Sequence, residues 1–71
     1  MWTELIKIEQ LKTLKEGDRL KFENFGYDPI FFIVEQVGTH TVSIHNELHS
    51  DIPLLTPIEL LLGLELEMED G

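Results

Sequence analysis

The sequence contains no cysteine among its 71 residues, which excludes disulfide bonds and thiolate metal sites. The absence fits a reducing compartment, and we expect a cytoplasmic protein. Long apolar runs are missing too, since Ile30–Val34 and Leu60–Leu62 fall far short of the roughly 20 residues that cross a membrane as a helix. The first 20 residues carry charges throughout and lack the apolar stretch of a secretory signal peptide.

Lysine and arginine are absent after position 21. The first 21 residues hold all five basic side chains and four acids, whereas residues 22–71 hold ten acids and no base. Because phosphate contacts need clustered lysine and arginine, we expect no direct binding to nucleic acid. An anionic membrane surface would repel the acidic segment in the same way, so we expect no membrane binding. The distribution favours a protein partner with a basic surface, such as a nucleic-acid-binding protein.

Catalytic signatures are also missing. The chain has no nucleophile elbow and no phosphate-binding glycine loop, and it is too short to build much of a water-excluding pocket. We therefore predict a protein that is not an enzyme and needs no cofactor.

His45, Glu47 and His49 would face one side of an extended strand and could ligate zinc. We interpret them as a polar surface segment, with a small metal-binding protein as the alternative.

The length allows one small domain, residues 1–71, whose N-terminal segment has two interpretations. Alternation from Trp2 onward predicts a short strand near Trp2–Ile8, followed by a helical turn over Glu9–Lys15. The same residues also fit one face of a single helix over Thr3–Glu16, and periodicity does not decide between them. We prefer the strand followed by the turn.

The middle of the chain has the pattern of β-strands. Arg19–Glu23 alternates polar and apolar residues, as a half-buried strand does. Asn24–Pro29 is rich in turn formers and predicts a loop. Ile30–Val37 begins with an unbroken apolar run and predicts a central strand. A turn at Gly38 connects this strand to the alternating segment His40–His45. The two strands are expected to form a hairpin.

The C-terminal third predicts a short helix between two strands. Asn46–Leu55 is expected to be a loop with a short edge strand, because Pro53 cannot donate a ladder hydrogen bond. Thr56 resembles the N-cap of a capping box and predicts a helix over Pro57–Leu62. Leu64–Met68 alternates leucine or methionine with glutamate, which predicts a last strand with its glutamates in water.

This order of elements resembles that of small SH3-like barrels, in which a single helical turn often precedes the last strand. The segment LKEGDRLKF, Leu14–Phe22, looks like the start of a strand in such barrels. The resemblance implies a mainly β fold, a small SH3-like barrel with a short helical turn before its last strand. The alternative is an α+β domain with an N-terminal helix on a three- or four-stranded antiparallel sheet.

We expect one negative face beside an apolar patch, formed by Glu59, Glu65, Glu67, Glu69 and Asp70 together with Glu47 and Asp51. The chain would then be a protein-interaction module, and self-association through exposed apolar side chains stays open. Its size and charge are also similar to those of small acidic phage-encoded inhibitors of the anti-CRISPR type. That similarity implies an alternative, a mimic of nucleic acid in a basic channel. The predicted partner-binding residues are Glu47, Asp51, Glu59, Glu65, Glu67, Glu69, Asp70, Phe25 and Tyr27.

Overall fold

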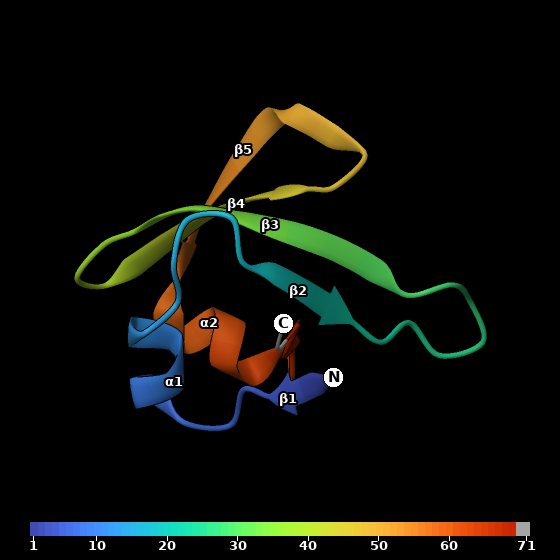
Figure 1. The fold of residues 1–71 in the computed structure, drawn as a ribbon, viewed down its shortest axis with the longest axis horizontal. Helices are drawn as coiled ribbons and strands as arrows, with labels where there is room; N and C mark the ends of the chain where they lie inside the picture. Colours follow the sequence, from blue (N-terminus) through green and yellow to red (C-terminus); the bar gives the residue numbers. More distant parts are fainter. Residues whose placement is uncertain (70–71) are drawn as a thin grey trace.

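The computed structural model describes residues 1–69, which form one antiparallel sheet and two short helices (Figure 1). The strands are β1 (Trp2–Glu4), β2 (Arg19–Phe22), β3 (Ile30–Val37), β4 (Thr41–Asn46), β5 (His49–Pro57) and β6 (Glu67–Glu69), and the helices are α1 (Ile8–Lys12) and α2 (Ile58–Gly63). Neither of these helices is long and apolar enough to cross a membrane.

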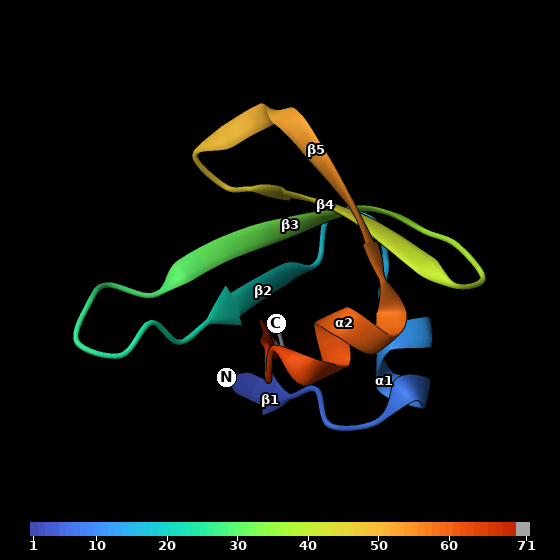
Figure 2. The same cartoon turned by 180° about the vertical axis from the view of Figure 1, so that it is seen from behind.

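The last strand is inserted between the first two. The order across the sheet is β1-β6-β2-β3-β4-β5, so β6 pairs with β1 on one side and with β2 on the other. Figure 2 shows β1, in blue, beside the red strand β6. The two ends of the described chain therefore meet in the sheet, although they are more than 60 residues apart in sequence.

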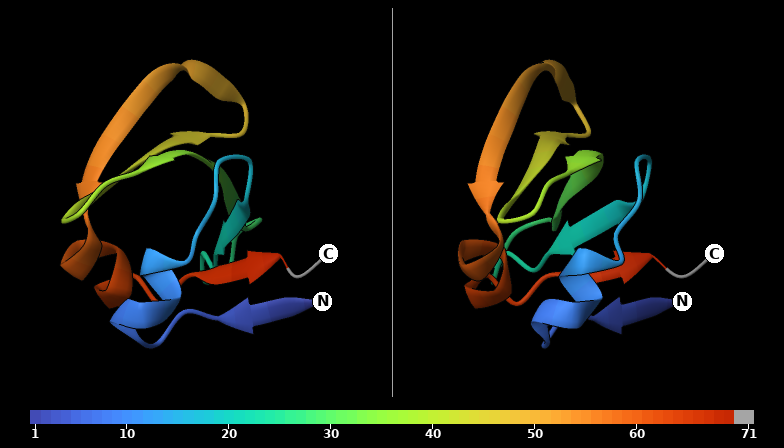
Figure 3. Two further views of the ribbon diagram at one scale, coloured as in Figure 1. Left: turned by 60° about the vertical axis from the view of Figure 1, so that its left-hand side comes forward. Right: turned by 90° about the vertical axis from the view of Figure 1, so that its left-hand side faces the viewer.

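The sheet curves around the helices but does not close (Figure 3). β1 and β5 are its two free edges, and no ladder joins them. The expected closed SH3-like barrel is therefore wrong, because the helices occupy the space in which the two edges would have to meet. The mainly β class and the short helix before the last strand are confirmed.

The core fills the space between the concave face of the sheet and the helices. Leu20, Val42 and Ile44, the apolar residues of the alternating segments, are buried, and Phe22 packs half-buried against the core. This confirms the alternation predicted for β2 and β4. The buried residues are Leu5, Leu11, Leu14, Leu20, Val34, Val42, Ile44, Ile58, Leu61 and Leu66.

The N-terminal segment forms a strand and then a helix, so the single helix over Thr3–Glu16 is wrong. The side chain of Gln10 explains the break between the two elements. Its Oε1 accepts hydrogen bonds from the backbone N–H groups of Ile6 (2.8 Å) and Lys7 (2.9 Å), the residues just before α1. These contacts satisfy backbone donors that a longer helix would have used within its own turns.

β5 confirms the predicted edge position but is longer than expected, because it runs over nine residues. Thr56 stays in this strand and does not cap the helix. Its backbone lies opposite Val42 in the ladder, and α2 begins with Pro57 at the N-cap position and no side-chain cap. The predicted capping box is wrong because pairing with β4 holds Thr56 in the extended chain.

The last strand is shorter than the alternation predicted. Glu65 lies in the left-handed region with φ of 53°, which interrupts the extended chain before β6. Leu66 is fully buried as expected, and Met68 packs half-buried against the core. Leu64 lies in the turn and remains 38% exposed, so its predicted place in the core is wrong.

Two neighbouring leucines of α2 test the position of the core. Leu61 is fully buried, whereas Leu60 is 57% exposed. Replacing Leu61 by alanine leaves a cavity and should lower the free energy of unfolding by about 2–5 kcal/mol. The matched change Leu60→Ala should alter it by about 0.5 kcal/mol. Urea unfolding followed by circular dichroism measures both, and equal losses would contradict this placement of α2.

Candidate functional site

The convex face of the sheet, opposite the core, carries charged residues in rows that cross the strands. Pairing of β1, β6 and β2 places Glu4, Glu67 and Lys21 in one row. In the next row, Trp2 of β1 lies opposite Glu69 of β6. Continuing the pairing of β6 with β2 by one residue places Arg19 on the other side of Glu69. Side chains in one row are close neighbours, so opposite charges in them interact directly.

Arg19 is the centre of this face. Its Nε and Nη2 atoms each lie 3.0 Å from a carboxylate oxygen of Glu47, and its Nη1 lies 3.4 Å from Glu69 Oε2. The guanidinium also lies 4.0 Å from the ring centroid of Phe31 and 5.9 Å from that of Trp2. The hydrogen bond to Glu47 raises the pKa of Arg19, so the group stays charged. Two of the predicted partner-binding acids are therefore paired within the molecule.

Lys21 lies between two further acids. Its Nζ is 3.8 Å from Glu67 Oε2 and 3.7 Å from Glu23 Oε1, and it lies 4.7 Å from the Trp2 ring centroid. These separations exceed those of a good charge-assisted hydrogen bond, so Lys21 balances part of the negative charge without fixing either carboxylate tightly.

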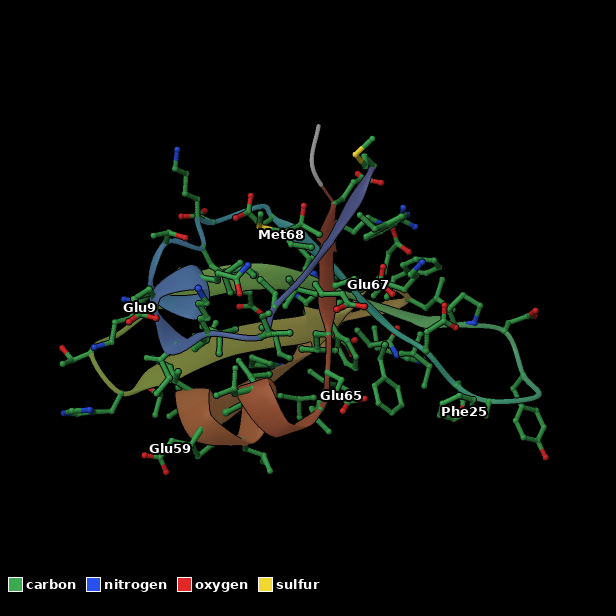
Figure 4. The ribbon with its side chains drawn as sticks, turned by 90° about the horizontal axis from the view of Figure 1, so that it is seen from below. Glu9, Phe25, Glu59, Glu65, Glu67 and Met68 are labelled. Atoms are coloured by element: carbon green, nitrogen blue, oxygen red, sulfur yellow. The ribbon has the colours of Figure 1, made fainter. Side chains whose placement is uncertain are left out.

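A groove of about 400 Å³ opens beside Lys21, where β1, the end of β2 and the turn before β6 meet. Phe25 and Ile6 lie at this groove with exposed fractions of 94% and 64%. Figure 4 shows Glu65, Glu67 and Phe25 on the same side of the molecule. We call this the acidic groove. Its lining residues are Glu4, Leu5, Ile6, Glu23, Phe25, Glu65, Leu66 and Glu67.

Three of the predicted partner-binding residues, Phe25, Glu65 and Glu67, come together in the acidic groove. Tyr27 is 78% exposed in the same loop but does not line it. Asp51 is exposed on β5, and Glu59 lies in a separate depression beside Lys12. Asp70 lies outside the described residues. The acids thus do not form one continuous face, because those of β6 and the β4–β5 turn lie next to Arg19 and Lys21.

Sequence reasoning missed the other three exposed residues of the groove, Glu4, Ile6 and Glu23. The alternation Trp2, Glu4, Ile6 did place two of them on one face of a strand. The sequence did not indicate which strand would pair with this one. Its partner is β6, which lies at the other end of the sequence. Glu23 joins the groove for the same reason, since it follows the other neighbour of β6.

The described residues do not bring the three candidate metal ligands together. His45 Nδ1 lies 2.8 Å from Glu35 Oε2, and Glu47 is held by Arg19. These contacts direct the two side chains to different partners. Within residues 1–69 no three histidine, cysteine or acidic side chains lie close enough together to hold a metal ion.

No protein-family model, curated protein or solved structure matches this chain. The role of the acidic groove must therefore be inferred from its own chemistry.

The pairing of Arg19 with Glu47 and Glu69 can be tested by an exchange that keeps the charge. Arg19→Lys removes the planar guanidinium, and with it the hydrogen bond from Nη2 and the Nε contact to the carboxylate of Glu47. We expect a lower urea midpoint than in the parent. The matched change Lys15→Arg, at an exposed position, should leave the midpoint unchanged. An unaltered midpoint for Arg19→Lys would show that the cluster does not stabilise the sheet.

Proposed function

We propose that the chain is a non-enzymatic protein-interaction module whose acidic groove binds an extended, basic segment of another protein. The observation that carries the proposal is the combination of four carboxylates with two exposed apolar side chains in one groove. Carboxylates alone would suit any cation. Phe25 and Ile6 beside them favour a segment in which lysine or arginine is next to apolar residues.

The charge of the groove is not balanced within the described chain. Among residues 1–69, Lys21 forms ion pairs with two of the four carboxylates, Glu23 and Glu67, whereas Glu4 and Glu65 make none. Carboxylates held side by side repel one another, and a lysine or arginine of a partner would relieve that repulsion. The groove therefore has a stronger attraction for a cationic side chain than an isolated surface acid has.

Affinity and specificity come from different parts of the groove. An exposed ion pair contributes about 0–1 kcal/mol, so the carboxylates chiefly steer the partner and select its charge. Burial of an exposed phenylalanine contributes about 1.5–3 kcal/mol, so Phe25 supplies a large share of the affinity. A segment with both features is therefore preferred over a merely cationic one.

Mimicry of nucleic acid, as in the phage inhibitors, is the second candidate and has less support. A mimic needs an extended array of negative charges at phosphate-like intervals. On the convex face, Arg19 and Lys21 lie between the acids and interrupt such an array. A mimic would bind a folded basic protein with a steep dependence on salt, whereas the groove should bind a short peptide with an apolar contribution that salt does not screen.

The first test of the groove removes charge without changing shape. In the triple variant Glu4→Gln, Glu23→Gln and Glu65→Gln, we expect about tenfold weaker binding of a fluorescent (Lys-Leu)4 peptide, because three exposed ion pairs are lost. Fluorescence anisotropy at 50 and 300 mM NaCl measures the affinity.

The matched control is Glu9→Gln, Glu16→Gln and Glu59→Gln, which removes the same charge elsewhere. Figure 4 shows Glu9 and Glu59 far from the groove. This control should bind as the parent does, apart from a small loss that 300 mM NaCl abolishes. Equal losses in both triple variants would mean that only the net charge matters, and the proposed groove would be wrong.

The second test separates two aromatic residues of one loop. Phe25→Ser should weaken (Lys-Leu)4 binding about tenfold, because an apolar contact is lost, while Tyr27→Ser should not. Both side chains are largely exposed, so both variants should fold with unchanged stability. The peptide (Lys-Ser)4 should bind the parent more weakly than (Lys-Leu)4 does. Equal binding of the two peptides would leave no role for Phe25.

A further inference from the structure

β5 is the longer of the two free edges of the sheet, and its apolar side chains are exposed. Leu55 is 73% exposed and Leu54 is 45% exposed on this nine-residue strand. An apolar edge of this length normally invites a second strand to add to it. The main-chain geometry of β5 decides whether it can accept one.

The register of β5 with β4 shows which residues direct their main-chain groups outward. The amide of Ile58 donates to the carbonyl of His40 at 3.0 Å, and this pair continues the ladder in which Pro57 lies opposite Thr41. In an antiparallel ladder, hydrogen-bonded and non-hydrogen-bonded pairs alternate. Residues 57, 55 and 53 are therefore the non-hydrogen-bonded ones, and their main-chain groups point away from β4.

Two of these three outward positions are prolines. Pro53 and Pro57 have no N–H, so Leu55 alone offers an outward donor between them. A strand added along this stretch would make one donor contact where a regular edge makes three. The proline rings would also lie where the carbonyl groups of an added strand must approach.

The opposite edge is closed by a side chain. The N–H of Leu5 donates to the carbonyl of Leu66 at 2.9 Å, so the main-chain groups of Glu4 point away from β6. The carbonyl of Glu4 accepts a hydrogen bond from Gln10 Nε2 (3.0 Å), and the N–H of Ile6 donates to Gln10 Oε1 (2.8 Å). The amide of Gln10 thus binds Glu4, the last residue of β1, and Ile6 beyond it, as the peptide group of a neighbouring strand would.

We infer that both free edges of the sheet are closed to strand addition, β5 by Pro53 and Pro57 and β1 by the side chain of Gln10. The chain therefore does not associate edge to edge with copies of itself. Self-association, which the sequence left open, is blocked at the main chain even though apolar side chains are exposed beside it.

Removal of one closing group should open its edge. Pro53→Thr leaves two consecutive outward residues with donors, at 53 and 55, and avoids Pro57, which also precedes α2. We expect the parent to sediment as a monomer from 10 µM to 1 mM. The variant should associate over that range, and the exchange rate of the Leu55 amide with solvent should fall at least tenfold as the variant associates. Analytical ultracentrifugation and hydrogen exchange by NMR measure the two effects.

Two further variants provide a control for the proline substitution and a test of the β1 edge. Pro29→Thr removes a proline from a loop and should stay monomeric. Gln10→Met keeps the length of the side chain but frees the Glu4 carbonyl, and it should associate through β1 while the Leu55 amide stays unprotected. A folded variant that remains monomeric at 1 mM would overturn the inference for its edge. A parent whose Leu55 amide becomes protected with rising concentration would overturn it for β5.

Discussion

The pairing of β6 with both β1 and β2 is the contact on which the rest of the molecule depends. β1 has β6 as its one ladder neighbour, and the three paired residues of β6 continue directly from the buried Leu66. The acidic groove is built from both neighbours of β6 and from the turn before it, so it exists only when these three strands are paired. A ligand of the groove must then stabilise the folded chain, because it cannot bind the unfolded one in the same way.

The same insertion explains why a chain with separated charges folds into a surface with mixed charges. In sequence, all lysine and arginine residues precede the long acidic segment. In space, β6 carries Glu67 and Glu69 next to β2, which carries Lys21 and Arg19. The paired acids anchor the cations over the aromatic rings of the convex face. At the groove, Glu4 and Glu65 make no ion pair among the described residues, so part of the negative charge there stays unbalanced.

Alternation and turn residues in the sequence correctly predicted the strands that are joined by short connections. The strands from Arg19 to Asn46 follow from alternation and from the turns between them, and the structure confirms them. Thr56 was misplaced because its conformation depends on the β4 ladder, which is distant in sequence, and Leu64 because the next residue, Glu65, takes a left-handed conformation that alternation does not reveal. Phe25 was identifiable as a loop aromatic, but Glu4 was not, since nothing near it in sequence indicates which strand it will face. A site formed by paired strands that are distant in sequence is therefore the feature that is hardest to predict from the sequence alone.

The closed edges and the acidic groove both concern apolar side chains that a small domain cannot bury. A chain of this length buries only about 60% of its unfolded surface, so apolar side chains inevitably remain outside. Some of them remain on β5, whose prolines we infer to oppose an added strand, and some at the groove beside its carboxylates. A second copy brings a net charge of −9 with it and is repelled from the groove, whereas a basic segment is attracted. Under the proposed function, the apolar side chains of the groove would thus be available to a cationic partner and not to a second copy of the chain.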